Sequence, residues 1–284
     1  MIVDAHTHAW PRWPYRPPVP DDATRGGVEV LLHEMAAAGV DRAVVVAAEI
    51  DRNADNNDYV AAAVARHPGR LHHFADLDSR WSPRHHTAGA ADRLAALADR
   101  YPLAGISHYL GPDNDGWLRS ADARALFTAA ERRGLLMGLA AGPAWHADLR
   151  ALAATVPGLP ILCNHLALVP AWPGGVADAL ARVLDPAAPA NLIVKVSGLQ
   201  YGAADPWDVP HRAALDVVRA YYETWGPRRL VWGSDHPASG AAMTYRQSLE
   251  AVRRHCDFIA PADLPLVLGG TLAGLLGDPE GVRA

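Results

Sequence analysis

The chain begins Met1-Ile2-Val3-Asp4-Ala5-His6-Thr7-His8, a short run of apolar and β-branched residues that ends in two histidines. A run with so little polar alternation is typical of a strand buried on both faces of a parallel sheet. Residues two apart in a strand point to the same face, so we expect His6 and His8 to project side by side. Seven similar runs follow, at residues 43–48, 71–77, 103–108, 135–140, 160–165, 192–197 and 230–234.

Segments with apolar residues at helical spacing separate these eight runs. They include residues 88–101, 121–133, 147–156, 176–184 and 213–225. We therefore predict the α/β class, with residues 1–284 forming a single (β/α)₈ TIM barrel in which helices surround eight parallel strands. An open doubly wound sheet is the alternative fold, but the Gly-x-Gly-x-x-Gly turn that usually follows its first strand is missing here.

The composition is that of a globular protein and argues against several classes of partner. Of the 284 residues, 50% are hydrophobic and 20% are charged, and the net charge is −5 without a basic cluster, so we expect no nucleic-acid partner. No apolar run approaches the roughly 20 residues that span a bilayer, and no secretory signal precedes the first strand. We expect a cytoplasmic protein with no membrane partner, and we make no prediction of its oligomeric state.

Four chemically active residues stand at the ends of predicted strands. His6 and His8 end the first run, His165 ends the run 160–165, and Asp235 directly follows the run 230–234. The carboxyl ends of parallel strands meet at one end of a barrel, where such proteins build their sites. We therefore predict that these three imidazoles and one carboxylate form a catalytic site.

This set of side chains allows two kinds of chemistry. His6, His8, His165 and Asp235 could bind one divalent metal ion, Zn²⁺ or Mn²⁺, which would act as a Lewis acid and lower the pKa of bound water. Alternatively the imidazoles could polarise a substrate carbonyl directly, without a metal. In both cases Asp235 is our candidate for the general base, with a pKa that neighbouring cationic groups are expected to lower.

Aromatic and histidine side chains in the loops after the strands are candidates for substrate binding. Trp10 follows the first strand, Trp81 follows the third, and His108 and Tyr109 end the fourth. Loops that follow the strands converge at one end of a barrel, so we expect these four side chains to contact a small-molecule substrate. The same loops also carry Trp13, Tyr15, Arg80, His85 and His86 as weaker candidates.

The ordered motifs resemble the amidohydrolase superfamily along nearly the whole chain. The resemblance rests on Asp4-Ala5-His6-Thr7-His8, Cys163-Asn164-His165, Lys195-Val196-Ser197-Gly198 and Trp232-Gly233-Ser234-Asp235-His236-Pro237. It is nearest to the branch of TIM-barrel hydrolases that contains sugar lactonases, pyrone dicarboxylate lactonase and aminocarboxymuconate semialdehyde decarboxylases. Lactonase-like members commonly show a similar Lys-x-Ser-Gly run, which implies that Lys195 takes part in substrate binding.

The departures from the superfamily pattern are equally informative. The run 135–140 carries none of the histidine that metal-dependent members often place on the fifth strand, and no bridging Lys or carboxylate ends the fourth. A binuclear metal centre is therefore not expected. The resemblance implies a hydrolase that opens a sugar or dicarboxylate lactone. The alternatives are a metal-dependent decarboxylase of an unsaturated or aromatic carboxylic acid, and a barrel that binds a small molecule without turnover.

Overall fold

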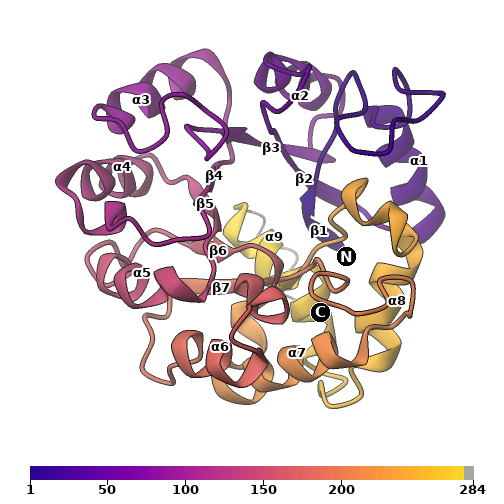
Figure 1. Ribbon diagram of the computed structural model, residues 1–284. Coiled ribbons are helices and arrows are strands. Elements are labelled where there is room, and N and C mark those ends of the chain that lie inside the picture. The colour runs from indigo at the N-terminus through magenta and orange to yellow at the C-terminus, as the bar shows by residue number, and fades with distance from the viewer. Residues whose placement is uncertain (278–284) are drawn as a thin grey trace.

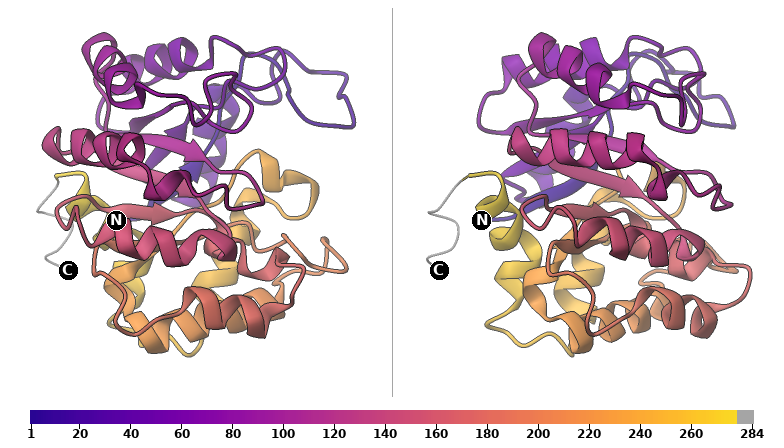
Figure 2. Two further views of the ribbon diagram at one scale, coloured as in Figure 1. Left: turned by 60° about the vertical axis from the view of Figure 1, so that its left-hand side comes forward. Right: turned by 90° about the vertical axis from the view of Figure 1, so that its left-hand side faces the viewer.

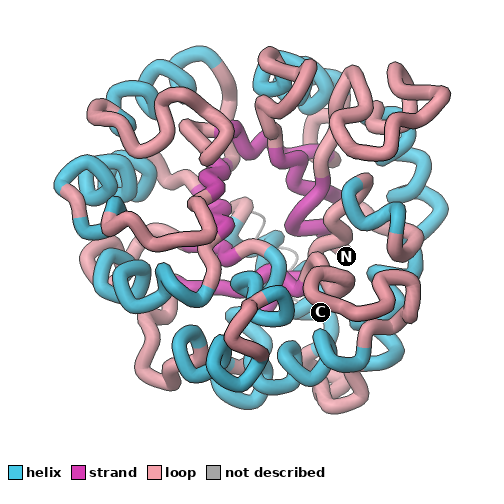
Figure 3. The backbone as a smooth tube through the Cα atoms, viewed as in Figure 1, coloured by secondary structure: helices cyan, strands magenta, loops and turns pink. Residues whose placement is uncertain are grey.

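Eight parallel strands form one sheet in the computed structural model, which describes residues 1–277. Each strand pairs with the next one along the chain, and each overlaps one of the eight predicted runs. Residues 278–284, the end of the predicted domain, lie outside the described residues. The strands form a ring that is seen end-on in Figure 3. They are β1 (Val3–Thr7), β2 (Arg42–Val46), β3 (Leu71–Asp76), β4 (Gly105–Tyr109), β5 (Leu136–Ala140), β6 (Ile161–Cys163), β7 (Leu192–Val196) and β8 (Leu230–Trp232).

An α-helix follows each strand and lies on the outside of the ring (Figure 1). This arrangement confirms the predicted (β/α)₈ TIM barrel, and the five helical segments named above correspond to α3 to α7. The helices are α1 (Val28–Ala38), α2 (Asn56–Arg66), α3 (Ala90–Arg100), α4 (Ala121–Arg132), α5 (His146–Ala153), α6 (Val176–Val183), α7 (Arg212–Trp225), α8 (Tyr245–His255) and α9 (Thr271–Leu275).

Local sequence explains where two of these helices begin. The side chain of Ser120 accepts a hydrogen bond from the Ala123 N–H and so caps α4. Thr244 and Gln247 form a reciprocal capping box at the start of α8. The buried side of α4 consists of residues three or four apart, which is the spacing of one helix face. These residues are Ala123, Leu126, Phe127 and Ala130.

Hydrogen bonds join β8 back to β1 and so close the barrel. The Asp235 N–H donates to the His6 carbonyl oxygen at 2.8 Å, and the His8 N–H donates to the His236 carbonyl oxygen. Beneath them, Oδ1 of the fully buried Asp4 accepts the N–H groups of His6 and Ser234 at 3.0 and 2.9 Å. The end of β1, which carries His6 and His8, and the segment after β8, which carries Asp235, are therefore fixed to each other.

The interior of the barrel is filled by side chains of uneven size. Phe74 of β3 is fully buried inside, and glycines of the next two strands, Gly105 of β4 and Gly138 of β5, face its ring. A Cβ atom at Gly105 would lie 2.7 Å from the Phe74 ring and 2.5 Å from the Leu136 carbonyl oxygen, so only glycine leaves room there. Gly138 likewise faces Phe74, at 3.4 Å.

The two ends of the barrel differ. Leu272 and Ala273 of α9 pack with Val3 and Ala5 of β1, so α9 covers the end where the strands begin. Figure 2 shows α9 at the same end as the N-terminus, with the long loop after β1 at the opposite end. The open end, where the strands finish, therefore remains for a site. Within residues 1–277, none of the helices has the length and apolar character that crossing a membrane requires.

Candidate active site

His6 and His8 lie side by side at the end of β1, as the strand periodicity predicts. Their Nε2 atoms are 3.2 Å apart. Nδ1 of His8 donates to the carbonyl oxygen of Val46 at 2.7 Å, so Nε2 of His8 carries the lone pair. Nδ1 of His6 lies 3.1 Å from Nζ of Lys195, which projects from β7. A chain of hydrogen bonds therefore runs from Lys195 through both imidazoles to β2.

Asp235 brings the third imidazole into the same group. Its Oδ1 lies 3.7 Å from His6 Nε2, 3.9 Å from His8 Nε2 and 4.0 Å from His165 Nε2. Both His165 and Asp235 have left-handed backbone conformations, with φ of 54° and 58°. Such conformations are uncommon for residues other than glycine, and they turn both side chains inward directly after β6 and β8. The four predicted catalytic residues thus lie together.

Tyr201 holds the other oxygen of Asp235 and is a contact that the sequence reasoning missed. Its hydroxyl donates to Asp235 Oδ2 at 2.7 Å, which leaves Oδ1 facing the three imidazoles. The available signal is Gly198, whose φ is +63° and where a Cβ would lie 2.5 Å from the Tyr201 ring. That glycine lets the loop after β7 turn back and place Tyr201 over the site.

Burial controls the charges in this group, and it corrects one expectation. We expected the pKa of Asp235 to be lowered, but burial raises it to about 7, in spite of the Tyr201 hydrogen bond and the attraction of Lys195. Burial outweighs these contacts because removal from water penalises the charged form. Burial also lowers the pKa of Lys195 to about 7 and that of His8 to about 4, so His8 is neutral near pH 7.

A cavity of about 260 Å³ opens directly onto this group. Three of the expected substrate contacts, Trp10, Trp81 and Tyr109, line it. Tyr109 and Arg80 also line a second cavity of about 710 Å³, so the two cavities adjoin each other at the open end of the barrel. The remaining residues that line the smaller cavity come from loops after several strands: His8, Tyr15, Ala48, Ile50, His165, Tyr201, Asp235 and Ala238.

Two expected substrate contacts are not at this cavity. Lys195 is fully buried inside the barrel, where its amine reaches His6 rather than the open space. His108 is also buried, and its ring points to His86, away from the Asp235 group. Their positions therefore do not support the expectation that they contact substrate. Strand position alone could not reveal this, because neighbouring loops decide which end-of-strand side chains reach the cavity.

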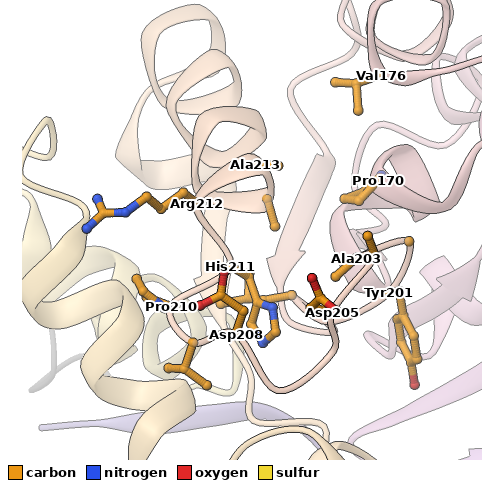
Figure 4. A pocket seen from close by; sticks show the side chains of 15 residues that line it. Pro170, Val176, Tyr201, Ala203, Asp205, Asp208, Pro210, His211, Arg212 and Ala213 are labelled. Carbon is orange, nitrogen blue, oxygen red and sulfur yellow. The ribbon is translucent and has the colours of Figure 1, made fainter.

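A separate cavity of about 450 Å³ lies between the loop after β7 and the start of α7. Its wall carries Asp205, Asp208 and His211 (Figure 4). Tyr201 stands at its edge, but the Tyr201 hydroxyl is turned away from this cavity and bonds Asp235. Tyr201 thus separates it from the cavity onto which the imidazoles open.

The donor atoms fit one divalent cation. One ligand atom each from His6, His8 and Asp235 lies within 4.8 Å of the other two, and all three residues are buried. His165 falls outside that compact group but reaches Asp235 Oδ1 at 4.0 Å. Imidazole nitrogen and carboxylate oxygen are the ligands that Zn²⁺ takes in catalytic sites.

Comparison with known proteins gives the family. The amidohydrolase family model matches residues 3–273. The chain belongs to the amidohydrolase family. An L-fucono-1,5-lactonase from Burkholderia ambifaria is 30% identical over 289 residues, which cover 94% of this chain and 92% of that protein. The predicted superfamily membership is therefore confirmed.

Solved structures of amidohydrolases share the fold. An amidohydrolase from Burkholderia multivorans with bound zinc has a TM-score of 0.78 at 19% identity, covering 98% of this chain and 100% of that one. A probable 2-pyrone-4,6-dicarboxylic acid hydrolase from Acinetobacter baumannii, with citric acid bound, has a TM-score of 0.73 at 20% identity, covering 97% and 99%. At these identities the likeness concerns the barrel alone.

Proposed function

We propose that this amidohydrolase is a hydrolase that opens a cyclic ester, a sugar lactone or a dicarboxylate lactone. The observation that carries the proposal is the position of Asp235 Oδ1, within 4.0 Å of three imidazole Nε2 atoms and at the wall of a cavity. The lactonase name of the 30% identical relative supports the same substrate class. An alkoxide leaves more readily than an amine, which favours an ester over an amide.

Asp235 is the proposed general base. Its pKa of about 7 is close to neutral pH, where a base both is ionised in part and accepts a proton readily. Oδ1 removes a proton from water as the water oxygen forms a bond to the lactone carbonyl carbon. When the ring C–O bond breaks, the same carboxylic acid returns that proton to the leaving alkoxide, and the product is a hydroxy acid.

Tyr109 and His165 are the proposed donors to the substrate carbonyl oxygen. Both line the cavity, and burial keeps the pKa of the Tyr109 hydroxyl well above its ordinary value, so it remains a donor. Nδ1 of His165 lies 3.1 Å from the Ser197 hydroxyl. With that hydroxyl donating to Nδ1, Nε2 of His165 carries the proton. Two donors aimed into a buried space stabilise the negative charge that develops on the carbonyl oxygen.

A metal ion is a proposed addition to this site rather than a requirement. His6, His8 and Asp235 would hold it, and a bound Zn²⁺ or Mn²⁺ would supply Lewis-acid polarisation of the carbonyl. Without a metal ion, the side chains of this site form hydrogen bonds with one another. Lys195 donates to His6 Nδ1, His6 Nε2 donates to His8 Nε2, and His8 Nδ1 donates to Val46.

Arg80 places a positive charge at the cavity, which favours a substrate that carries oxygen atoms. Arg80 lines both adjoining cavities, together with Tyr109, and Trp81 lines the smaller one. A guanidinium group pairs well with a carboxylate or with several hydroxyl oxygens, and aromatic faces pack against a sugar or pyrone ring. The expected substrate is therefore a small, oxygen-rich lactone.

A lactone panel tests the proposed function. We expect proton release from at least one aldonolactone or dicarboxylate lactone, followed with a pH indicator, and a loss of turnover of about 10²- to 10⁴-fold in Asp235→Asn. Asp257→Asn is the control and should retain turnover, because the Asp257 carboxylate is exposed, pairs with Arg219 and does not line the cavity. Release of CO₂ from carboxylic acids, with no lactone opened, would replace the proposal with the decarboxylase alternative.

A further inference from the structure

Three more histidines gather outside the proposed active site. His85 and His86 lie in the loop between β3 and α3, and His108 lies on β4. One ring nitrogen of each lies within 4.8 Å of the other two, and the Nε2 atoms of His86 and His108 are 3.4 Å apart. The proposed hydrolysis uses none of these side chains, so their convergence needs another explanation.

Hydrogen bonds determine which nitrogen of each ring carries a proton. Nδ1 of His108 lies 2.7 Å from the Leu77 carbonyl oxygen, and Nδ1 of His85 lies 2.9 Å from the Asp78 carbonyl oxygen. Nδ1 of His86 lies 2.5 Å from a carboxylate oxygen of Asp115. These oxygens only accept hydrogen bonds, so each Nδ1 is the donor and each Nε2 carries a lone pair.

Two nitrogen lone pairs 3.4 Å apart repel each other unless a cation lies between them. Two nitrogens on a tetrahedral Zn²⁺, each about 2.0–2.1 Å from the ion, are about 3.3–3.4 Å apart. The spacing between His86 and His108 therefore matches the requirement of a metal ion.

We propose that His85, His86 and His108 form a second metal site, separate from the proposed active site, for a divalent transition metal ion such as Zn²⁺. Imidazole nitrogen is the ligand type that zinc, copper and nickel share. An oxygen acceptor on the far nitrogen of each ring is the usual outer arrangement around metal-bound histidines. The His85 ring stacks on that of His86, with the ring centroids 3.6 Å apart, and so lies next to the other two rings.

The surroundings indicate what such an ion would do. His86 has a left-handed backbone with φ of 55°, and its ring stacks on Trp117 at 4.4 Å, with the ring planes 3° apart. The loop that carries His85 and His86 also carries Arg80 and Trp81, which line the active-site cavity. A metal ion would link this loop to β4 and so steady one wall of the cavity.

Zinc titration against a competing chelator tests the site, in variants that separate it from the first one. His8→Gln weakens the first site, so zinc bound by this variant reports on the second. Adding His86→Gln should weaken binding by more than the roughly 10- to 100-fold that loss of an outer hydrogen bond costs. Adding His255→Gln instead, an exposed histidine on α8, should leave the affinity unchanged.

Two further measurements make the outcome decisive. Zinc should raise the melting temperature of His8→Gln but not that of His8→Gln/His86→Gln, and circular dichroism should show both folded. Anomalous diffraction at the zinc edge should place one ion beside Nε2 of His86 and His108. The proposal is overturned if His8→Gln binds no zinc, if adding His86→Gln leaves the affinity unchanged, or if the ion lies elsewhere.

Discussion

At the scale of single residues, the two oxygens of Asp235 have different surroundings. Oδ2 accepts the Tyr201 hydroxyl, whereas Oδ1 faces three neutral imidazoles and the cavity. Burial raises the pKa of the carboxyl group, and the Tyr201 hydrogen bond opposes that rise by favouring the ionised form. Tyr201 is therefore expected to tune the base rather than to react.

Substituting Tyr201 by Phe removes the hydrogen bond that favours ionised Asp235. The pKa of Asp235 should rise further, so the rise of turnover with pH should move upward by about one pH unit. The measurement is the pH dependence of kcat/KM, corrected for spontaneous lactone hydrolysis. Tyr222→Phe is a matched control, because the Tyr222 hydroxyl donates to Asp263 at the same distance of 2.7 Å but outside the cavity. If the pH at which kcat/KM rises is unchanged or lower in Tyr201→Phe, the roles assigned to Tyr201 and Asp235 are contradicted.

Metal removal gives a second prediction at this scale. Lys195, His6, His8 and Val46 form a hydrogen-bonded chain that needs no ion, so we expect turnover to survive dialysis against a chelator. The measurement is activity beside elemental analysis of the same sample. If activity disappears with the metal and returns with Zn²⁺ or Mn²⁺, both in the natural chain and in His86→Gln, which lacks a ligand of the proposed second site, the metal is essential and direct polarisation by the imidazoles is wrong.

At the scale of secondary-structure elements, the site depends on how β1 is joined to β8. His6 and Asp235 belong to opposite ends of the sequence, and Asp4 accepts a backbone N–H from each side of this junction. Backbone hydrogen bonds from His6 and His8 to the segment after β8 belong to the same junction. The distances between Asp235 and the imidazoles of His6 and His8 are therefore set largely by this junction.

Replacing Asp4 by Ala leaves two buried N–H groups, those of His6 and Ser234, without their acceptor. This should lower the free energy of unfolding by about 2–6 kcal/mol, since each of the two unsatisfied buried groups costs about 1–3 kcal/mol. Asp4→Asn keeps an acceptor oxygen at the same position and should lose less than half as much. Urea denaturation of both variants measures the difference, and equal losses would mean that the two hydrogen bonds contribute little.

At the scale of the whole molecule, many ionisable groups are held in their neutral form by burial. Burial lowers the pKa of several imidazoles to about 3 or 4, whereas it raises the pKa of Asp4 to about 6 and those of Glu49 and Asp235 to about 7. The imidazoles outnumber these carboxyl groups. They are His8, His73, His108, His146 and His236.

These shifts predict that acid destabilises the fold. Unfolding returns each imidazole to a pKa of about 6.5, so below that pH the unfolded chain binds more protons through them and stability falls toward pH 4. The three carboxyl groups act oppositely, because their contribution is lost as the pH rises through 6 to 7. Each such imidazole lowers the free energy of unfolding by about 2 kcal/mol at pH 5.

Because imidazoles predominate, the melting temperature should fall by at least about 4 °C between pH 7 and pH 5. Scanning calorimetry at constant ionic strength measures this change. His73→Gln should reduce the pH dependence, since His73 is buried away from the cavity, whereas exposed His255→Gln should not. A melting temperature that stays constant or rises on acidification would contradict the prediction.

The sequence by itself determined the barrel and the grouping of His6, His8, His165 and Asp235. Apolar runs that alternate with helical segments are compatible with few folds, and a strand directs residues such as His6 and His8 to one face whatever surrounds them. Only the tertiary structure decided the rest. Burial, which depends on every neighbouring element, raised the pKa of Asp235. Contacts between distant loops brought Tyr201 to Asp235 and turned His108 toward His86, because loop conformation depends on packing that no local pattern encodes.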